Sequence, residues 1–367
     1  MTMRVTLSLS DTDERTAVER AVAELRMGRP VLLEAADGMA LVQSVEDLGP
    51  DQAAQLDAVR AGGARLVLPA ARLRRLGLDR RENGVVALPI LDHSRVQSLA
   101  FALDARVDAP VRATSPVDED ALELARLALS LPAVVVLPLS REVAVDASVL
   151  RVASEAVRSY RANRVSDLRI VARAPVPLEE APGTEFVVFR GGEGLRDQVA
   201  VVVNAPDPAG EVTVRLHSAC LTGDLFGSLK CDCGDQLRRS VRYMAESGGG
   251  ILLYLDQEGR GNGIANKIRA YHLQSQGYDT YDADEMLGFG PDQRRFDFAA
   301  TMLRQLGVTR VRLITNNPDK IAALENAGIA VVSHQRAPGR FTAENVRYLA
   351  AKRDRAGHLI DLDTPPR

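Results

Sequence analysis

Residues 212–249 read VTVRLHSACLTGDLFGSLKCDCGDQLRRSVRYMAESGG, and the organisation of the second half of the chain can be derived outward from this stretch. The apolar residues of VTVRLHS predict a strand. The segment CGDQLRRSVRYMAESGG predicts a helix that ends at its glycines. Cys220 and Cys231 lie in the loop between them, and Cys233, the third cysteine of the chain, is the first residue of the predicted helix.

Strands and helices alternate on both sides of this stretch. Strands are predicted at EFVVFR (185–190), QVAVVVN (198–204), ILLYLDQ (251–257) and VRLITNN (311–317). Helices are predicted at GIANKIRAYHLQSQG (263–277), RRFDFAATMLRQLG (294–307) and PDKIAALENAG (318–328). This alternation predicts a mixed, largely parallel sheet flanked by helices, with ligand groups at the strand ends.

The first half of the chain is also α/β in character. Helical patterns at 16–28 and 51–63 alternate with strand patterns at 30–35 and 133–139. A proline-containing segment at 159–183 is interpreted as a junction, with a boundary near residue 165. We therefore expect two domains, covering residues 1–164 and 165–367.

Composition excludes several classes of function. The hydrophobic and charged fractions, 46% and 26%, are ordinary for a soluble protein, and no apolar run reaches membrane-spanning length. The first residues, MTMRVTLSLSDTDER, lack a signal-peptide core. A net charge of -3 and scattered aromatic residues argue against binding a nucleic-acid polymer. We expect a cytoplasmic protein with a small-molecule substrate.

The three cysteines predict a metal site. Three thiolates can hold one Zn²⁺ and leave its fourth tetrahedral position open to water, whose pKa then falls to roughly 7. The alternatives are buried cysteines that serve only as small hydrophobic residues, or a disulfide with one thiol left over. Because the cysteines cluster in one window and occur nowhere else, metal binding is the favoured interpretation.

Polar or glycine-rich loops follow the predicted strands. They contain Arg215, His217 and Ser218; QEGRGNG at 257–263; Asp292 and Arg294; and Thr315, Asn316 and Lys320. Taken singly, each loop has an ordinary explanation as a turn, a surface ion pair or a capped helix start. Beside an open zinc they together predict hydrolysis of a nucleotide whose phosphates are held by cations and helix N-termini. These residues do not identify which nucleobase the nucleotide carries.

The C-terminal part resembles GTP cyclohydrolase II of riboflavin biosynthesis over about residues 166 to 360. The matching strings are HSxCLTGD, SLKCDCGDQL, ILLYxxQEGR, NKIRAYxLQxQGYDT, LGF and ITNNPDK. The resemblance implies a homodimer with one Zn²⁺ per subunit and Mg²⁺ on the substrate phosphates. It further implies conversion of GTP to 2,5-diamino-6-ribosylamino-4(3H)-pyrimidinone 5′-phosphate, formate and pyrophosphate.

The resemblance also implies roles for individual residues. Zinc would be held by the three cysteines and would activate water toward C8 of guanine, with Tyr271 assisting the second hydrolysis. Arg294 would attack the α-phosphate with Asp292 as its acid or base partner, since a protonated guanidinium must lose a proton to do so. Glu258 would accept hydrogen bonds from N1 and the 2-amino group of guanine. The implied GTP contacts are Arg215, Leu216, His217, Ser218, Gln236, Glu258, Gly259, Arg260, Thr280, Thr315 and Lys320.

Three positions depart from the family pattern. Ala219 replaces a glutamate, Asp256 replaces an arginine, and Asn262 stands in a GNG string where GIG or NIG is usual. Two alternatives to GTP cyclohydrolase activity therefore stay open. One is a paralogue acting on another nucleotide or in pyrimidine catabolism, and the other is a non-catalytic nucleotide-binding protein.

The first half distantly resembles dihydroxybutanone-phosphate synthase. The likeness lies in the pattern of apolar and polar residues in two strings, AVAELRMGRPVLL and RAGGARLVLPAARLRRLGL. The acidic metal-binding run that its chemistry needs is replaced by EAADGMALVQ. We expect a degenerate, non-catalytic domain that serves dimerisation, stability or regulation.

Overall fold

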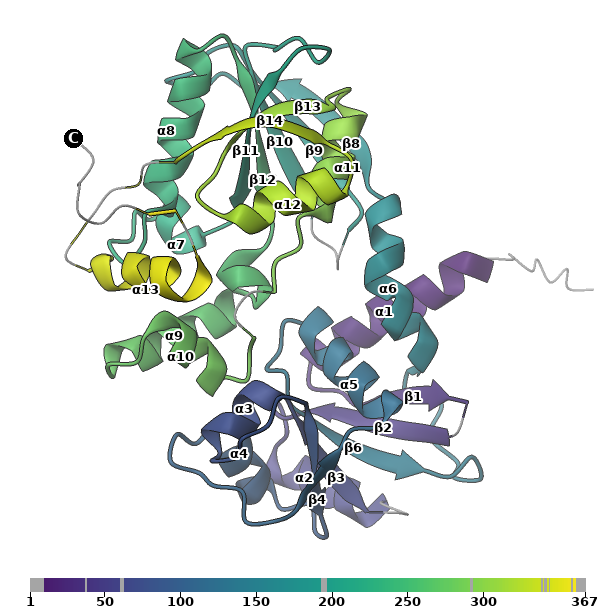
Figure 1. Ribbon diagram of the computed structural model, residues 1–367. Coiled ribbons are helices and arrows are strands. Elements are labelled where there is room, and N and C mark those ends of the chain that lie inside the picture. Colours follow the sequence, from purple (N-terminus) through teal and green to yellow (C-terminus); the bar gives the residue numbers. More distant parts are fainter. Residues whose placement is uncertain are drawn as a thin grey trace, which may run out of the picture. The chain divides into compact units, whose positions relative to one another are not determined.

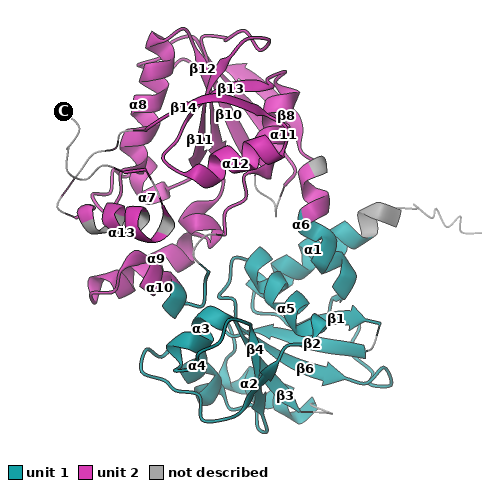
Figure 2. Cartoon of the chain, viewed as in Figure 1, with its two compact units in different colours: residues 1–161, 285–290 teal, residues 162–284, 291–367 magenta. Residues whose placement is uncertain are grey.

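The computed structural model describes residues 10–36, 38–59, 63–192, 197–290, 293–337, 339, 342, 344–357 and 359–360. The chain divides into two compact units, which Figure 2 draws in two colours. The first contains residues 1–161 and 285–290, and the second contains residues 162–284 and 291–367. The passage from the first unit to the second lies in helix α6 (Ser154–Ser166), which also contains the expected boundary near residue 165.

The first unit is a sheet with helices on both faces. Its described strands are β1 (Val31–Ala35), β2 (Gly38–Ser44), β3 (Ala64–Leu68), β4 (Gly84–Leu88), β5 (Val111–Ala113), β6 (Val134–Leu139) and β7 (Arg151–Ala153). Its described helices are α1 (Ser10–Arg26), α2 (Pro50–Val59), α3 (Ala70–Arg75), α4 (His93–Phe101), α5 (Pro116–Leu127) and the start of α6. The strand order is β5-β4-β3-β6-β2-β1-β7, and among these pairs only β1 with β7 is parallel.

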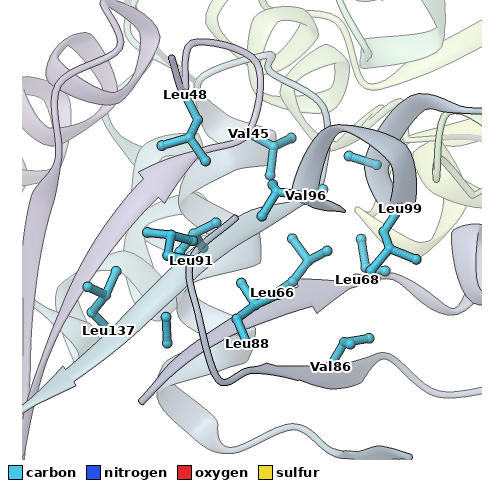
Figure 3. Packing of buried hydrophobic residues seen from close by; sticks show 14 of the residues in the cluster. Val45, Leu48, Leu66, Leu68, Val86, Leu88, Leu91, Val96, Leu99 and Leu137 are labelled. Carbon is cyan, nitrogen blue, oxygen red and sulfur yellow. The ribbon is translucent and has the colours of Figure 1, made fainter. Parts of the chain in front are cut away.

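Side chains alternate between the two faces of this sheet, so its strands contribute to two hydrophobic cores. Leu32 of β1 lies in the core that α2, α3 and α4 cover, whereas Val31 and Leu33 lie in the core that α1, α5 and α6 cover. Figure 3 shows the first of these cores, where leucines and valines from strands and helices meet. The α/β class predicted for this half of the chain is confirmed.

Residues 285–290 belong to the first unit, although their place in the sequence lies inside the predicted second domain. Phe289 is part of the core covered by α2, α3 and α4, and Leu287 packs against that core. These two apolar residues are separated from the rest of the core by a long stretch of chain. Local sequence patterns do not reveal such a long-range contact.

The second unit is built on another sheet. Its described strands are β8 (Arg169–Pro175), β9 (Thr184–Arg190), β10 (Gln198–Val203), β11 (Val212–Ser218), β12 (Gly250–Leu255), β13 (Arg310–Ile314) and β14 (Ala330–Gln335). Its described helical segments are α7 (Leu221–Asp224), α8 (Cys233–Glu246), η1 (Glu258–Gly261), α9 (Ile264–Ser275), α10 (Thr280–Met286), α11 (Asp297–Gln305), α12 (Pro318–Asn326) and α13 (Val346–Ala356). The last residues of α10 belong to the first unit.

This sheet has the order β14-β13-β11-β12-β10-β9-β8 and is mixed, as predicted. Among its described strands, the parallel pairs β11–β12, β11–β13 and β13–β14 lie on one side, and the pairs involving β10 and β9 are antiparallel. Helix α8 packs on one face, while α11 and α12 pack on the other (Figure 1). The loops after β11, β12 and β13 therefore leave the sheet at the same edge.

Residues 159–183, interpreted from the sequence as a junction, contain regular structure. They include the end of α6 and the whole of β8. Most side chains of β8 are exposed, because the strand lies at the edge of the sheet and is held mainly by backbone pairing with β9. It therefore lacks the apolar alternation by which a half-buried strand is recognised.

Candidate active site

Three cysteine thiols meet at the edge of the sheet where β11 ends. Cys220 follows β11, Cys231 lies in the loop after α7, and Cys233 begins α8. Their Sγ atoms all lie within 4.8 Å of one another, and those of Cys220 and Cys231 are 3.6 Å apart. Tetrahedral zinc with bonds of about 2.3 Å requires sulfur atoms about 3.8 Å apart. The donor set and its spacing therefore fit a single metal ion.

Gly223 of α7 keeps the space among these thiols clear. A Cβ atom at this position would lie 2.7 Å from Sγ of Cys231 and 3.0 Å from Sγ of Cys220. It would also lie 3.1 Å from Cβ of Cys233. A side chain here would push against all three candidate ligands.

We expect Gly223→Ala to weaken metal binding although it removes no ligand. The added methyl group displaces the thiols, and the expected loss of zinc affinity is about 10- to 100-fold, as for other residues that orient ligands. Competition with a chromophoric zinc chelator measures it. Gly210→Ala, a glycine outside the site, is the matched control and should keep the wild-type affinity. Equal affinities in the two variants would contradict the role given to Gly223.

Lys267 of α9 lies between the thiols and a carboxylate. Its Nζ is 3.1 Å from Sγ of Cys220 and 2.8 Å from Oε1 of Glu258. Burial by itself would lower the pKa of Lys267, but the charge of Cys220 and the hydrogen bond to Glu258 outweigh it and raise that pKa. Hydrogen bonds from Cys231 and Cys233, together with the Lys267 ammonium, lower the pKa of Cys220. A thiolate is favoured there, as a metal ligand requires.

Asp224 organises the start of the thiol loop. Its carboxylate accepts from the backbone N–H of Cys220 at 2.9 Å and from the hydroxyl of Tyr254 at 3.0 Å. His217 Nε2 lies 3.1 Å from both carboxylate oxygens. Burial lowers the pKa of His217, so the imidazole stays neutral and donates to Asp224 through Nε2. The buried Nδ1 has no protein partner in the described part of the chain.

A first cavity surrounds the thiols. Its described lining consists of Ser218, Ala219, Cys220, Cys231, Cys233, Gln257, Glu258, Gly259, Arg260, Lys267, Ala270, Tyr271, Gln274, Thr280, Asp284 and Arg294. Burial raises the pKa of Tyr271 to about 12, so its hydroxyl is protonated at neutral pH. The cavity thus combines candidate metal ligands with a carboxylate and a phenol.

A second cavity shares Ser218, Cys233 and Arg294 with the first. Its described lining consists of Arg215, His217, Ser218, Asp232, Cys233, Gln236, Arg294, Thr315, Asn316, Asn317, Lys320 and Ile360. Because three residues line both cavities, the two lie next to each other. One ligand could therefore occupy both.

The second cavity is rich in buried hydrogen-bond donors. Arg215 is only 5% exposed and donates to the carbonyl of Ile314 at 3.0 Å, while its Nε has no partner among the described residues. Lys320 is 6% exposed, and its Nζ donates to the carbonyl of Leu216 at 2.7 Å. Within the part of the chain that the structure describes, the buried Nδ2 group of Asn317 has no hydrogen-bond partner. Buried cations and unused donors suit an anion such as phosphate.

Almost all of the predicted contact residues that the structure describes line one cavity or the other. Leu216 is the exception, because its side chain lies in the hydrophobic core between the sheet and α11 and only its carbonyl reaches Lys320. Asp292 lies outside the described residues.

Sequence reasoning missed several residues of the site. Asp224 and Lys267 hold the thiol loop, and Asp284 pairs with Arg260 at 3.0 Å. Asp224 and Lys267 lie within the quoted strings HSxCLTGD and NKIRAYxLQxQGYDT. These strings could therefore have pointed to Asp224 and Lys267 as site residues. Which groups the two side chains contact is decided by the folded loops and could not be predicted from the strings.

The three departures from the family pattern lie in different surroundings. Ala219 lines the first cavity. Asp256 is not among the described lining residues of either cavity, and its backbone N–H donates to the side chain of Gln198 at 2.8 Å. Asn262 is 4% exposed, and its carbonyl accepts from Asn266 at 2.9 Å. Only the change at 219 alters the described surface of the cavities.

In the part of the chain that the structure describes, no helix has both the length and the apolar character needed to span a membrane.

Comparison with known proteins gives consistent matches. The family model for GTP cyclohydrolase II matches residues 169–336. GTP cyclohydrolase-2 of Xylella fastidiosa (strain Temecula1 / ATCC 700964) is 45% identical over 354 residues, which cover 94% of this chain and 87% of that protein. GTP cyclohydrolase-2 of Azospirillum brasilense is 42% identical over 365 residues, which cover 94% of each chain.

Among solved structures, a two-domain 3,4-dihydroxy-2-butanone 4-phosphate synthase from A. baumannii covers 87% of this chain and 98% of its own. Its sequence identity is 18% and its TM-score is 0.33. A likeness at this level supports no conclusion about either unit.

Proposed function

The chain belongs to the GTP cyclohydrolase II family, and we propose that it hydrolyses GTP as the first step of riboflavin biosynthesis. The proposed products are 2,5-diamino-6-ribosylamino-4(3H)-pyrimidinone 5′-phosphate, formate and pyrophosphate. The observation that carries this proposal is the pair of adjacent cavities, one holding three thiols and the other buried cations. A nucleoside triphosphate would place its base in the cavity with the thiols and its charged phosphates in the cavity with the buried cations.

We propose one Zn²⁺ per subunit, held by Cys220, Cys231 and Cys233. When bound, zinc would supply a Lewis acid that activates water near neutral pH. Mg²⁺ would enter with the phosphates as part of the substrate. The open space that Gly223 leaves among the thiols supports the proposed metal position.

The first cavity is proposed to hold the guanine. Glu258 would accept hydrogen bonds from the base edge; its Oε1 already accepts from Lys267, and its Oε2 accepts from the backbone N–H of Leu221 at 2.6 Å. Oε1 also accepts from the backbone N–H of Gly259 at 2.7 Å, so three of the about four acceptor sites of the carboxylate are used. For Glu258 to accept from both N1 and the 2-amino group, one of these bonds would have to give way. Tyr271, protonated in this cavity, would assist the second hydrolysis.

Three water molecules balance the proposed reaction. One opens the imidazole ring at C8, and a second cleaves the resulting formamide to formate and an amine. The third cleaves the bond between the α- and β-phosphates and leaves a 5′-monophosphate. In that step Arg294, which lines both cavities, would attack the α-phosphate and expel pyrophosphate, and the third water would then release the 5′-monophosphate from the guanidine.

The second cavity is proposed to hold the phosphates. Arg215 and Lys320 supply positive charge, and Gln236 and Thr315 supply neutral polar groups. The Gln236 side chain accepts from the guanidinium of Arg215 and donates to Asp232, so these groups are fixed before substrate binds. Such preorganisation lowers the cost of holding a charged ligand.

The direct test is a product assay on the zinc-loaded full chain with GTP and Mg²⁺. Formate, pyrophosphate and the diaminopyrimidine chromophore should appear in equal amounts. Formate without pyrophosphate would contradict the coupling of the two cavities. Turnover of another nucleotide in place of GTP would favour the paralogue suggested by Ala219, the one departure in the described cavity lining.

We expect Glu258→Gln to lower kcat/KM for GTP by about 10- to 100-fold. A charged acceptor is worth about 1.5–3 kcal/mol, and each 1.36 kcal/mol is tenfold in rate. Steady-state kinetics with GTP check this, and zinc content should stay at one per chain. Glu246→Gln, an exposed residue at the end of α8, is the control. An unchanged kcat/KM in Glu258→Gln would remove this residue from guanine recognition.

The homodimer is proposed from the family resemblance, and the cytoplasmic location is proposed from the composition of the sequence. Sedimentation velocity of the full chain tests the first, with a single species of twice the chain mass as the expected result. The first unit is proposed to be non-catalytic, which an assay for dihydroxybutanone-phosphate synthase activity tests.

A further inference from the structure

Lys267 of α9 is a cation held away from solvent beside the thiols of the second unit. Its side chain is 11% exposed. Nζ lies 3.1 Å from Sγ of Cys220 and 2.8 Å from Oε1 of Glu258. Burying a lysine is costly unless its ammonium is paired. The buried ammonium therefore needs a partner, and it has two of different chemistry.

The surroundings of Lys267 restrict its side chain. Nζ lies 5.7 Å from the centroid of the Tyr271 ring, one turn further along the helix and within the range of a cation–π contact. On another side the turn η1 comes close to the helix. Gly259 there has a φ of +61°, and a Cβ atom on it would lie 3.2 Å from Cβ of Lys267. These contacts keep the ammonium beside the thiols.

An ion pair with Glu258 explains only part of this arrangement. The Glu258 carboxylate also accepts from the backbone N–H groups of Gly259 at 2.7 Å and Leu221 at 2.6 Å, so its position is fixed by the chain. An ammonium has three donors. Pairing with the carboxylate requires one of them, whereas Lys267 also directs a donor to Cys220. The contact with sulfur therefore calls for an explanation of its own.

The charge of a thiol site gives that explanation. Three thiolates that hold a divalent metal ion leave the site with one net negative charge, which weakens the ion as a Lewis acid. A cation that donates to a ligand sulfur offsets this charge, and such partners of metal ligands tune the bound metal. Arg260, another cation of the first cavity, pairs with Asp284 at 3.0 Å and lies over the ring of Tyr281. Lys267 is placed on the thiols themselves.

We propose that Lys267 balances the charge of the thiol site, its ammonium donating to the thiolate of Cys220 while Glu258 holds that ammonium in place. The part of this inference that concerns catalysis rests on the proposed function. A metal ion held by the three thiols is a stronger Lewis acid with this cation present than without it. Because Lys267 acts through Cys220, it is a positioning residue.

The test uses the full chain loaded with Co²⁺ in place of Zn²⁺ and reads the sulfur-to-cobalt charge-transfer band. A sulfur that loses its hydrogen bond gives up an electron more readily, so the band of Lys267→Met should move to longer wavelength. Glu258→Gln, which keeps an acceptor for the ammonium, should shift the band less. Arg269→Met is the matched control and should keep the wild-type band. Arg269 lies in the same helix, donates to Oδ1 of Asn266 at 2.7 Å and is not part of the described lining of either cavity.

Turnover gives the second readout. With one zinc per chain in each variant, Lys267→Met should lower kcat for formate release by about 10- to 100-fold, the usual cost of losing a partner of a metal ligand. Arg269→Met should stay within about twofold of wild type. If the wild type turns over no GTP, the proposed function fails, and the position of the cobalt band still decides whether Lys267 acts on the thiols.

A Lys267→Met protein that holds one cobalt per chain and keeps the wild-type band would overturn the proposal. If this variant does not fold or does not bind cobalt, Lys267→Gln replaces it, because an amide is polar but carries no charge. The band of Lys267→Gln should also move to longer wavelength. A band that coincides with the wild-type band would overturn the proposal in that case too.

Discussion

Cys231→Ser is expected to abolish zinc binding and to lower GTP turnover by more than about a thousandfold. Cys231 is one of three thiols within 4.8 Å of one another, and a serine hydroxyl does not replace a thiolate ligand. A Lewis acid contributes several kcal/mol to the barrier, and each 1.36 kcal/mol is tenfold in rate. Metal content by plasma mass spectrometry and formate release measure the two effects together.

Ser228→Ala is the matched control for this change. Ser228 lies in the same loop, where its Oγ accepts from the backbone N–H of Lys230 at 3.2 Å. It offers no ligand to the thiol site, so one zinc per chain and nearly full activity are expected. A Cys231→Ser protein that keeps its zinc and its formate release would show that the thiol cluster is not the catalytic metal site.

Arg294→Ala is expected to lower pyrophosphate release by at least about a thousandfold, because it removes the group proposed to attack the α-phosphate. Arg294 lines both cavities, and no other described arginine does. Arg294→Lys should rescue little, because an ammonium lacks the planar fork of donors. Coupled-enzyme detection of pyrophosphate checks both variants.

Arg295→Ala controls for removing an arginine from this loop. The Arg295 guanidinium pairs with Asp297 and lies over the ring of Phe298, and Arg295 is not part of the described lining of either cavity. Near wild-type release is expected. If Arg294→Ala releases pyrophosphate as fast as Arg295→Ala does, the phosphate chemistry uses other groups.

Local patterns predicted much of the second unit. VTVRLHS is strand β11 with the predicted bounds, and the helix predicted from Cys233 is α8. The mixed sheet and the resemblance to GTP cyclohydrolase II are both confirmed. These features depend on apolar periodicity and on short strings, which are properties of neighbouring residues.

Long-range contacts were not predictable in the same way. The buried pairing of Arg72 with the carbonyl of Met286 joins residues far apart in the chain. Asp224 accepts from Tyr254 only because β11 and β12 are neighbours in the sheet. The sequence could suggest that the three cysteines share a metal, since they lie in one window. The groups that hold the thiol loop come from several elements, and their convergence appears only in the fold.

The most direct test of the account is a crystal structure of the zinc-loaded full chain with a GTP analogue that resists cleavage between its α- and β-phosphates. Anomalous scattering at the zinc edge should give one peak among Cys220, Cys231 and Cys233. The guanine should lie in the first cavity, and the phosphates should lie beside Arg215 and Lys320 in the second. Zinc bound elsewhere, or an analogue with its phosphates outside the second cavity, would contradict the assignment of the two cavities to one GTP site.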